Sequence, residues 1–366
     1  ISDASGNLPG VAGSIDWTTN GSIDGSSTKG TNFTLKTYLE SSGLVTNMVL
    51  DGNSVISLSN NDSGTSNTIF GKNVGTIDSG SNYNVFIGED VATENTLADA
   101  TQNTAVGYRS GHSLTSGDSN SFYGRQTGLE MQDGSENTFI GMNAGAVSVS
   151  GTKMVAVGVN AIGTGNVTTA ATGTVAIGYS ALTSLTSGAN NLAIGKDALL
   201  GHTIGNRNIA IGNGAMDGNG GVTVNNSNDN TFLGFDAGGG TWTTAVCQQN
   251  VGIGNYSLDA PMNGANFNTA VGWSSLTKVT TGDSNVAVGS SSGLNITAGV
   301  QNVIVGADSD ISDIDAGNEI VLGYGVTGQG SNKATIGNAD ITDVYMASDS
   351  GATVHCAGIG DGTDTL

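Results

Sequence analysis

The chain has 366 residues, with 10 Lys and Arg against 31 Asp and Glu, so its formal net charge is −21. This acidic balance argues against nucleic acid and anionic membranes as electrostatic partners, and it favours solubility and the binding of cations. With 59 Gly, only 2 Pro, 37% hydrophobic and 11% charged residues, the composition is not that of a disordered polyelectrolyte. No apolar run approaches the roughly 18 residues of a bilayer span, so we expect no membrane insertion.

Residues 1–66 precede the repeats described below and are expected to form a connecting region of β-structure and coil. Two stretches in it, Leu44–Leu50 and Ser54–Leu58, carry the aliphatic and β-branched residues that are typical of strands. Gly and Ser clusters lie between such stretches and indicate turns. We therefore predict short strands joined by turns in this region.

A short phrase recurs sixteen times between residues 67 and 337: a polar residue, usually Asn, then three mostly apolar or Thr residues, then Gly. Nine of the fifteen spacings between the closing glycines are 17 residues. A helix-pair repeat needs about 33 residues, whereas one coil of a β-solenoid needs far fewer. The spacing therefore predicts an all-β parallel solenoid of about 16 coils with a period of about 17 residues. At about 4.8 Å for each stacked strand, the rod would be roughly 75 Å long.

Two features of the phrase predict how each coil is built. The closing glycine is expected at a corner where a positive φ or a close backbone approach excludes a Cβ. Asn stands four residues before that glycine in 12 of 16 copies, and stacked Asn side chains can form a ladder from coil to coil. A second short strand is expected after the glycine, so that each coil would hold two short strands and two turns.

Both faces of the strand before the glycine are apolar. The residue just before the glycine and the residue two positions earlier share one face, while the residue between them points the other way. That middle residue is Ala in seven copies and Phe in four. One face can line the interior of the coil, and the other needs a second surface to cover it. We predict that the Ala and Phe face forms the interface of a homotrimer, with these candidates: Ala105, Phe122, Phe139, Ala176, Ala193, Ala210, Ala270 and Ala287.

The irregular coils are the first candidates for recognition. Spacings of 22 and 20 residues insert extra chain around Asp217–Asp229 and Gly238–Gln249, and Trp242 lies on the second insertion. Insertions in solenoids become loops on one face. Aromatic residues also follow several corner glycines, where exposed rings can stack on sugars. The receptor-contact candidates are Trp242, Tyr108, Tyr179, Phe235, Trp273 and Tyr324; packing against the next coil or a neighbouring chain is the alternative for the corner rings.

One coil near the C-terminal end concentrates acidic residues. Asp308, Asp310, Asp313 and Asp315 offer the oxygen ligands that Ca²⁺ prefers, although their spacing lacks the order of an EF-hand. A solvated acidic edge is the alternative. No catalytic residue and no other cofactor is predicted, because the glycine-rich matches at Gly289–Gly293 and Gly323–Gly328 coincide with ordinary repeat corners. Cys247 and Cys356 have no metal-binding spacing and are free, buried or paired.

The phrase Asn-Thr-Ala-Val-Gly-Tyr-Arg-Ser-Gly from Asn103, and Thr-Val-Ala-Ile-Gly-Tyr-Ser-Ala-Leu from Thr174, resemble repeats of two related groups. One is the head domain of trimeric autotransporter adhesins, a left-handed parallel β-roll. The other is the repeat region of bacteriophage tail fibres. The resemblance covers about residues 67–337. It implies a left-handed β-roll, a trimeric fibre and an extracellular location.

The C-terminal segment, residues 338–366, breaks the period and is expected to contain β-structure. Residues 334–345 resemble the segment that often precedes a C-terminal chaperone in tail fibres, which favours the phage group. The function implied by the resemblance is attachment of a virion to a glycan or envelope protein on the host surface. The alternatives are a bacterial surface adhesin, a polysaccharide-degrading tailspike and a structural spacer.

Overall fold

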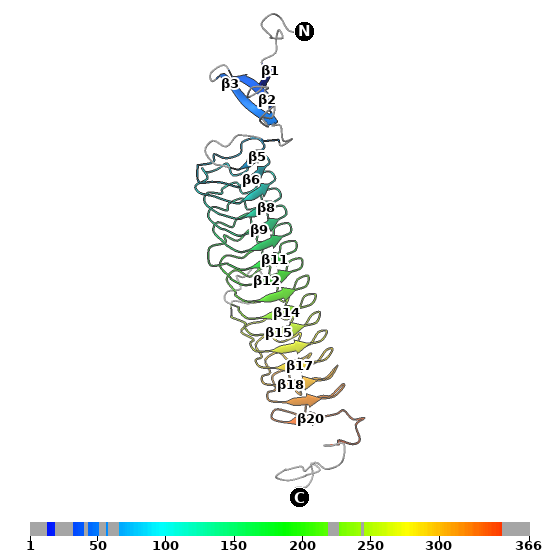
Figure 1. Cartoon of the computed structure of the whole chain (residues 1–366). Helices are drawn as coiled ribbons and strands as arrows, with labels where there is room; N and C mark the ends of the chain where they lie inside the picture. Colours follow the sequence, from blue (N-terminus) through cyan, green and yellow to red (C-terminus); the bar gives the residue numbers. More distant parts are fainter. Residues whose placement is uncertain are drawn as a thin grey trace, which may run out of the picture.

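The structure is a computed structural model, and it describes residues 13–18, 32–39, 43–50, 56–57, 66–218, 227–242 and 245–345. Within these ranges every regular element is a β-strand. The strands form two sheets, one of four strands and one of sixteen. Figure 1 shows the sixteen strands stacked along one side of an elongated column.

The N-terminal region contains the four-stranded antiparallel sheet, in the order β1-β2-β3-β4. Its strands are β1 (Gly13–Thr18), β2 (Asn32–Leu39), β3 (Gly43–Leu50) and β4 (Ile56–Ser57). β3 confirms the strand predicted at Leu44–Leu50, and β4 lies within the stretch predicted at Ser54–Leu58. The pairing of β2 with β3 is irregular between Leu35 and Lys36, where the register shifts.

The repeat region is a parallel β-solenoid in which each coil contributes one three-residue strand. The sixteen strands pair in sequence order from β5 to β20, in register and parallel. Their bounds are β5 Thr68–Phe70, β6 Val85–Ile87, β7 Thr104–Val106, β8 Ser121–Tyr123, β9 Thr138–Ile140, β10 Val155–Val157, β11 Val175–Ile177, β12 Leu192–Ile194, β13 Ile209–Ile211, β14 Thr231–Leu233, β15 Val251–Ile253, β16 Thr269–Val271, β17 Val286–Val288, β18 Val303–Val305, β19 Ile320–Leu322 and β20 Ala334–Ile336. The predicted solenoid and its period of about 17 residues are therefore confirmed.

The corner glycines stack closely from coil to coil, as predicted. Gly107 has a φ of +138°, and a Cβ added to it would lie 2.3 Å from the carbonyl oxygen of Gly124 in the next coil. Gly195 has a φ of +137°, and its added Cβ would lie 2.2 Å from the oxygen of Gly212. Only glycine fits a corner where the next backbone approaches this closely.

The second strand predicted for each coil is wrong. After the corner the chain turns, because left-handed residues recur at the second and often the fourth position after the glycine. Arg109 has a φ of +53° and Leu182 a φ of +52°. Extended backbone cannot continue through such residues. The coils are still joined there by backbone hydrogen bonds, such as Asp197 N to Tyr179 O at 2.9 Å.

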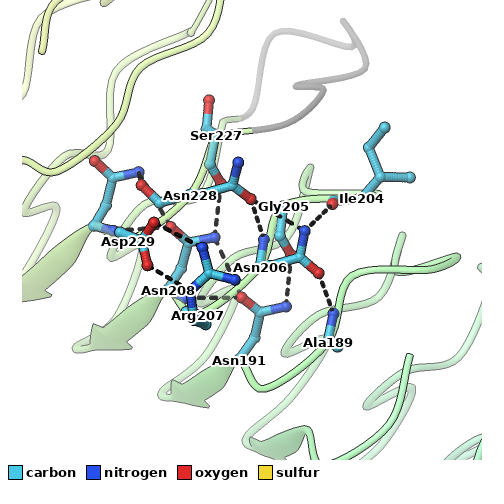
Figure 2. Close-up of polar contacts among 11 residues, drawn as sticks. Ala189, Asn191, Ile204, Gly205, Asn206, Arg207, Asn208, Ser227, Asn228 and Asp229 are labelled. Carbon is cyan, nitrogen blue, oxygen red and sulfur yellow. Dashed lines mark hydrogen bonds and ion pairs between the residues drawn. The ribbon is translucent and has the colours of Figure 1, made fainter. Parts of the chain in front are cut away.

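The asparagine ladder is confirmed, and it is buried. Asn103 Oδ1 accepts hydrogen bonds from both the backbone N and Nδ2 of Asn120, each at 3.0 Å. Asn120 Nδ2 also donates to Gly134 O at 2.8 Å. Figure 2 shows the same contacts where Asn208 joins Asn191. The ladder is interrupted at Met154, which contributes only its backbone N, and at Thr174, whose Oγ1 donates to Gly188 O and accepts from Asn191 N at 3.4 Å each.

The middle residue of each strand points into the coil. From β6 to β19 this residue is buried in every strand, and most of these residues are Ala or Phe. The trimer-interface prediction for that face is therefore wrong, because these side chains are 0% exposed within their own chain and leave no surface for a second copy. The residues concerned are Ala105, Phe122, Phe139, Ala176, Ala193, Ala210, Ala270 and Ala287.

Candidate interaction surfaces

The outward side of the parallel sheet is the longest apolar surface among the described residues. The side chains on either side of each buried middle residue point away from the interior, and twelve large apolar ones are 36–62% exposed. We call the surface formed by these twelve residues the outer strand face: Phe70, Tyr123, Ile140, Ile177, Ile209, Leu233, Ile253, Val288, Val303, Val305, Ile320 and Ile336.

The outer strand face is continuous because the strands pair in register. Half-buried aliphatic residues on the same side of the sheet fill the places between its members: Ile177 lies beside the half-buried Ile194, and Ile194 lies beside the half-buried Ile211. Side chains one strand apart on the same face are close enough to touch. Monomeric proteins rarely expose a contiguous apolar patch larger than a few hundred Å², and such patches mark interaction sites. The exposed apolar face of the sheet is therefore the face opposite to the one predicted from the sequence.

Trp242 does not protrude, contrary to the prediction. It is 0% exposed, and its ring packs edge-on against Phe232, with 5.9 Å between the ring centroids. Its Nε1 donates to Gly238 O at 2.7 Å, which satisfies the polar end of the ring. Room for these rings comes from Gly238 and Gly252, where an added Cβ would meet Phe232 at 2.7 and 2.6 Å. The second insertion thus fills the core at this residue, and Trp242 is no receptor contact.

His202 is buried beside Trp242 and has no hydrogen-bond partner at either ring nitrogen. The two rings meet edge-on, with 5.4 Å between their centroids. Burial lowers the pKa of His202 to about 3, because the charged imidazolium would lose its hydration without gaining a partner. His202 is therefore a neutral core residue.

The five aromatic side chains predicted at the corners are exposed. Their exposed fractions range from 41% at Phe235 to 70% at Tyr324, and Tyr108, Tyr179 and Trp273 lie between. Tyr108 also lies under the guanidinium carbon of Arg125, 6.0 Å from the ring centroid. Exposure agrees with a contact role and does not by itself assign one.

Phe235 and Trp273 are brought together by a residue that the sequence reasoning missed. Tyr256 lies between them, with ring-centroid distances of 5.4 Å to Phe235 and 6.5 Å to Trp273. Tyr256 is the second residue after its corner glycine, whereas the predicted aromatic residues are all the first. The signal was present as three aromatic residues in three consecutive coils. We call Phe235, Tyr256 and Trp273 the aromatic row.

Two carboxyl groups, Asp236 and Asp259, lie in the coils of the aromatic row, and a third, Asp217, lies in the preceding coil. Burial raises the pKa of Asp259 to about 6, and the nearby Asp236 and Asp217 carboxylates add to this shift. Burial also raises the pKa of Asp236. A Cβ added to Gly214 would meet Asp236 Oδ1 at 2.1 Å and Asp217 Oδ2 at 3.8 Å, so these two carboxylates approach each other. This part of the rod is strongly acidic.

The acidic coil at residues 308–315 spreads its carboxylates over different partners. Asp310 Oδ2 accepts from the backbone N of Asn295 at 3.0 Å and from its Nδ2 at 2.7 Å. Asp315 Oδ1 accepts from Thr297 Oγ1 at 3.2 Å, and Asp308 and Asp313 are exposed. In the ranges that the structure describes, no three His, Cys, Asp or Glu side chains are arranged to hold a metal ion. The calcium site stays a prediction.

The Cys247 thiol is buried, and burial raises its pKa. The backbone N of Gly264 donates to its Sγ at 3.3 Å. Cys356, the other cysteine, lies outside the described residues. A buried thiol with a raised pKa is a poor nucleophile, so Cys247 is a packing residue.

Among the residues that the structure describes there is no helix with the length and hydropathy required to cross a bilayer. A scan against protein-family models found no match, and a search of the curated proteins found no significant match.

Proposed function

We propose that this chain is one of three identical subunits of a non-catalytic, extracellular attachment fibre. The observation that carries the proposal is the outer strand face. Three rods that place these faces toward a common axis would remove the apolar stripe of every chain from water. Burial of apolar area at about 25 cal/mol per Å² favours such an assembly.

The copies of this chain are suited to cover one another. Every coil has an apolar or aromatic residue just before its corner glycine, and the strands pair in register, so identical rods can match along their length. Closed assemblies of identical chains are the usual form of soluble oligomers. The resemblance to autotransporter heads and tail-fibre repeats supports three chains and a left-handed β-roll.

Attachment to a host surface is the role proposed for the fibre, in a phage virion. The resemblance of residues 334–345 to the segment before a tail-fibre chaperone supports the virion. A bacterial surface adhesin is the second candidate, supported by the same repeat phrases. Neighbouring genes distinguish them: baseplate genes support the phage fibre, and an outer-membrane anchor supports the adhesin.

Light scattering on the full-length chain tests the assembly. We expect a mass three times the 36.3 kDa of one chain. A monodisperse monomer contradicts the proposal. Incubation of the purified protein with bacterial surface polysaccharide tests the absence of catalysis, because progressive shortening of the polymer would identify a tailspike instead.

A further inference from the structure

The aromatic row lies on a corner of the rod. Phe235 and Trp273 each follow a corner glycine, and Tyr256 is the second residue after its own. The backbone N of Tyr256 donates to Phe235 O at 2.9 Å, which holds these two coils together beneath the rings. The rings of Phe235 and Trp273 are 41% and 54% exposed. The row thus spans three consecutive coils.

One polar side chain is fixed at the row. Asn255 occupies the coil between Phe235 and Trp273, and its Oδ1 accepts from the backbone N of Phe235 at 2.9 Å. The Asp236 carboxylate, by contrast, lies toward Gly214 in the preceding coil. Ligand sites typically combine aromatic surface with a few fixed polar groups. A row of rings beside a fixed amide suits a ligand that has apolar C–H faces and hydroxyl edges.

The corner is a poor place for contact between copies of this chain. An interface core is depleted of charged residues. The residue after the corner glycine is charged in other coils, as in Lys72, Glu89, Arg125 and Lys196. These charges would have to be buried if the corner packed against a neighbouring rod along its length. The outer strand face carries no such charges among its twelve residues.

The charge around the aromatic row selects the class of ligand. Asp217, Asp236 and Asp259 lie close enough to influence one another, and the whole chain carries a net charge of −21. An anionic polysaccharide would meet like charge at this site. A neutral oligosaccharide carries no charge that these carboxylates would repel.

We propose that Phe235, Tyr256 and Trp273 form a stacking site for a neutral oligosaccharide, with Asn255 as the polar group beside the rings. The inference rests on the proposed attachment function and goes further by naming the ligand class and the residues. In a trimer the fibre carries three equivalent copies of the site, which favours attachment to a surface that displays many copies of the glycan.

The test measures binding of the full-length protein to maltohexaose and N-acetylated chitohexaose, with hexagalacturonate as the anionic comparator. Calorimetry and tryptophan fluorescence give the affinity, and light scattering gives the mass of every variant. We expect at least one neutral hexasaccharide to bind and hexagalacturonate to bind more weakly. Trp273→Ala and Tyr256→Ala should each reduce the affinity about tenfold, in line with the ~1–3 kcal/mol lost when an aromatic stacking partner is removed.

Tyr83→Ala is the matched control, because Tyr83 is an exposed ring, 63% exposed, in a distant coil and is not one of the receptor-contact candidates. It should leave the affinity within about twofold, a small fraction of the tenfold step. The inference is overturned if neither neutral hexasaccharide binds, if hexagalacturonate binds more tightly, or if Tyr83→Ala weakens binding as much as Trp273→Ala.

Two outcomes separate this inference from the proposed function. If Trp273→Ala breaks the trimer, the ring belongs to an interface between chains and the glycan site is overturned. If the trimer persists and Trp273→Ala still binds intact bacterial cells with unchanged affinity, the fibre keeps its attachment role and the aromatic row is not its site. In addition, if protease treatment of the cells abolishes binding of the fibre, the receptor is a protein, and the glycan site is also overturned.

Discussion

Phe139 and Gly145 lie six residues apart in one coil, and a Cβ added to Gly145 would come within 2.2 Å of Phe139 Cε2. The same combination of a large strand residue with a small residue six positions later, or the reverse, occurs in other coils. In three of the four coils whose middle strand residue is Phe, the residue six positions later is Gly, as in Phe122 with Gly128 and Phe232 with Gly238; in the fourth, Phe86 is followed by Ala92. Where the middle residue is Ala, a large side chain often follows, as with Leu199 after Ala193. The two positions share one volume inside the coil.

Ala193→Phe should destabilise the rod, and Leu199→Gly should partly rescue it. The added ring has no room beside Leu199, and overpacking of a core costs about 1–3 kcal/mol. Removal of Leu199 restores the Phe and Gly arrangement of the coil at Phe139. Thermal unfolding at a fixed protein concentration measures the effect. Ile194→Phe, on the outward side of the same strand, is the control, and equal losses for both substitutions would contradict the shared volume.

Thr174→Asn should stabilise the protein by repairing the asparagine ladder. Thr174 makes only long hydrogen bonds, with 3.4 Å from its Oγ1 to Gly188 O and 3.4 Å from Asn191 N to its Oγ1. An Asn there can donate to Gly188 and accept from Asn191, a gain of about 1 kcal/mol. Asn120→Ala should cost about 2 kcal/mol or more, since it leaves Gly134 O buried without its donor. Unfolding midpoints that do not move in opposite directions would contradict this account.

The period, the corner glycines and the asparagine ladder were predictable because each is repeated in many coils. Which face of the strand points into the coil was not predictable, because both faces are apolar and alternation alone does not distinguish the inner face from the outer one. The pairing of a small middle residue with a large later one (Ala193 with Leu199), or of a large one with Gly (Phe139 with Gly145), does indicate which face is interior. However, the two positions are six residues apart, and the second lies outside the strand. The prediction of a second strand in each coil was wrong because residues in the left-handed conformation, such as Leu182, have no sequence signature of their own.

The prediction that Trp242 protrudes from the rod was wrong for a related reason. An insertion into a periodic array is expected to lie outside the core, and the period says nothing about an inward-turning loop. The compensating glycines, Gly238 and Gly252, are visible in the sequence only once Phe232 is known to point inward. Tyr256 was not predicted as a corner ring because it is the second residue after its corner glycine, whereas the predicted corner rings are all the first residue after theirs.

His202→Leu should stabilise the protein, and more so at acidic pH. The pKa of His202 falls from about 6.5 in the unfolded chain to about 3 in the folded one. Between these values the unfolded chain binds the proton, so wild-type stability decreases as pH falls below about 6.5. The variant lacks this loss, which amounts to about 2 kcal/mol at pH 5. His112→Gln is the control, and a parallel pH profile for wild type and His202→Leu would contradict the prediction.

Asp259→Asn should change the pH dependence of the stability in the direction opposite to His202→Leu. The pKa of Asp259 rises from 3.8 to about 6 on folding, so the folded chain binds its proton between these values. Wild-type stability is therefore favoured below pH 4 and lost as pH rises through about 6. Because Asp259 is partly exposed, solvent screening limits this loss to about 1–2 kcal/mol. Stability measured from pH 4 to 7 should be flatter for the variant, and an unchanged slope would contradict the shift.

The two sides of one strand should respond differently to charge. Ile177→Lys places an ammonium on the outer strand face, where the folded coil leaves Ile177 38% exposed. It should preserve the β-sheet circular dichroism but dissociate the assembly, because three such charges would meet between the chains. Ala193→Glu buries a carboxylate inside the coil with no partner, and the cost of several kcal/mol should unfold the surrounding coils. Circular dichroism and light scattering distinguish these results. If Ile177→Lys keeps the full mass of the wild-type assembly, the copies do not meet through the outer strand face; if Ala193→Glu remains folded and only dissociates, the interior position of Ala193 is refuted.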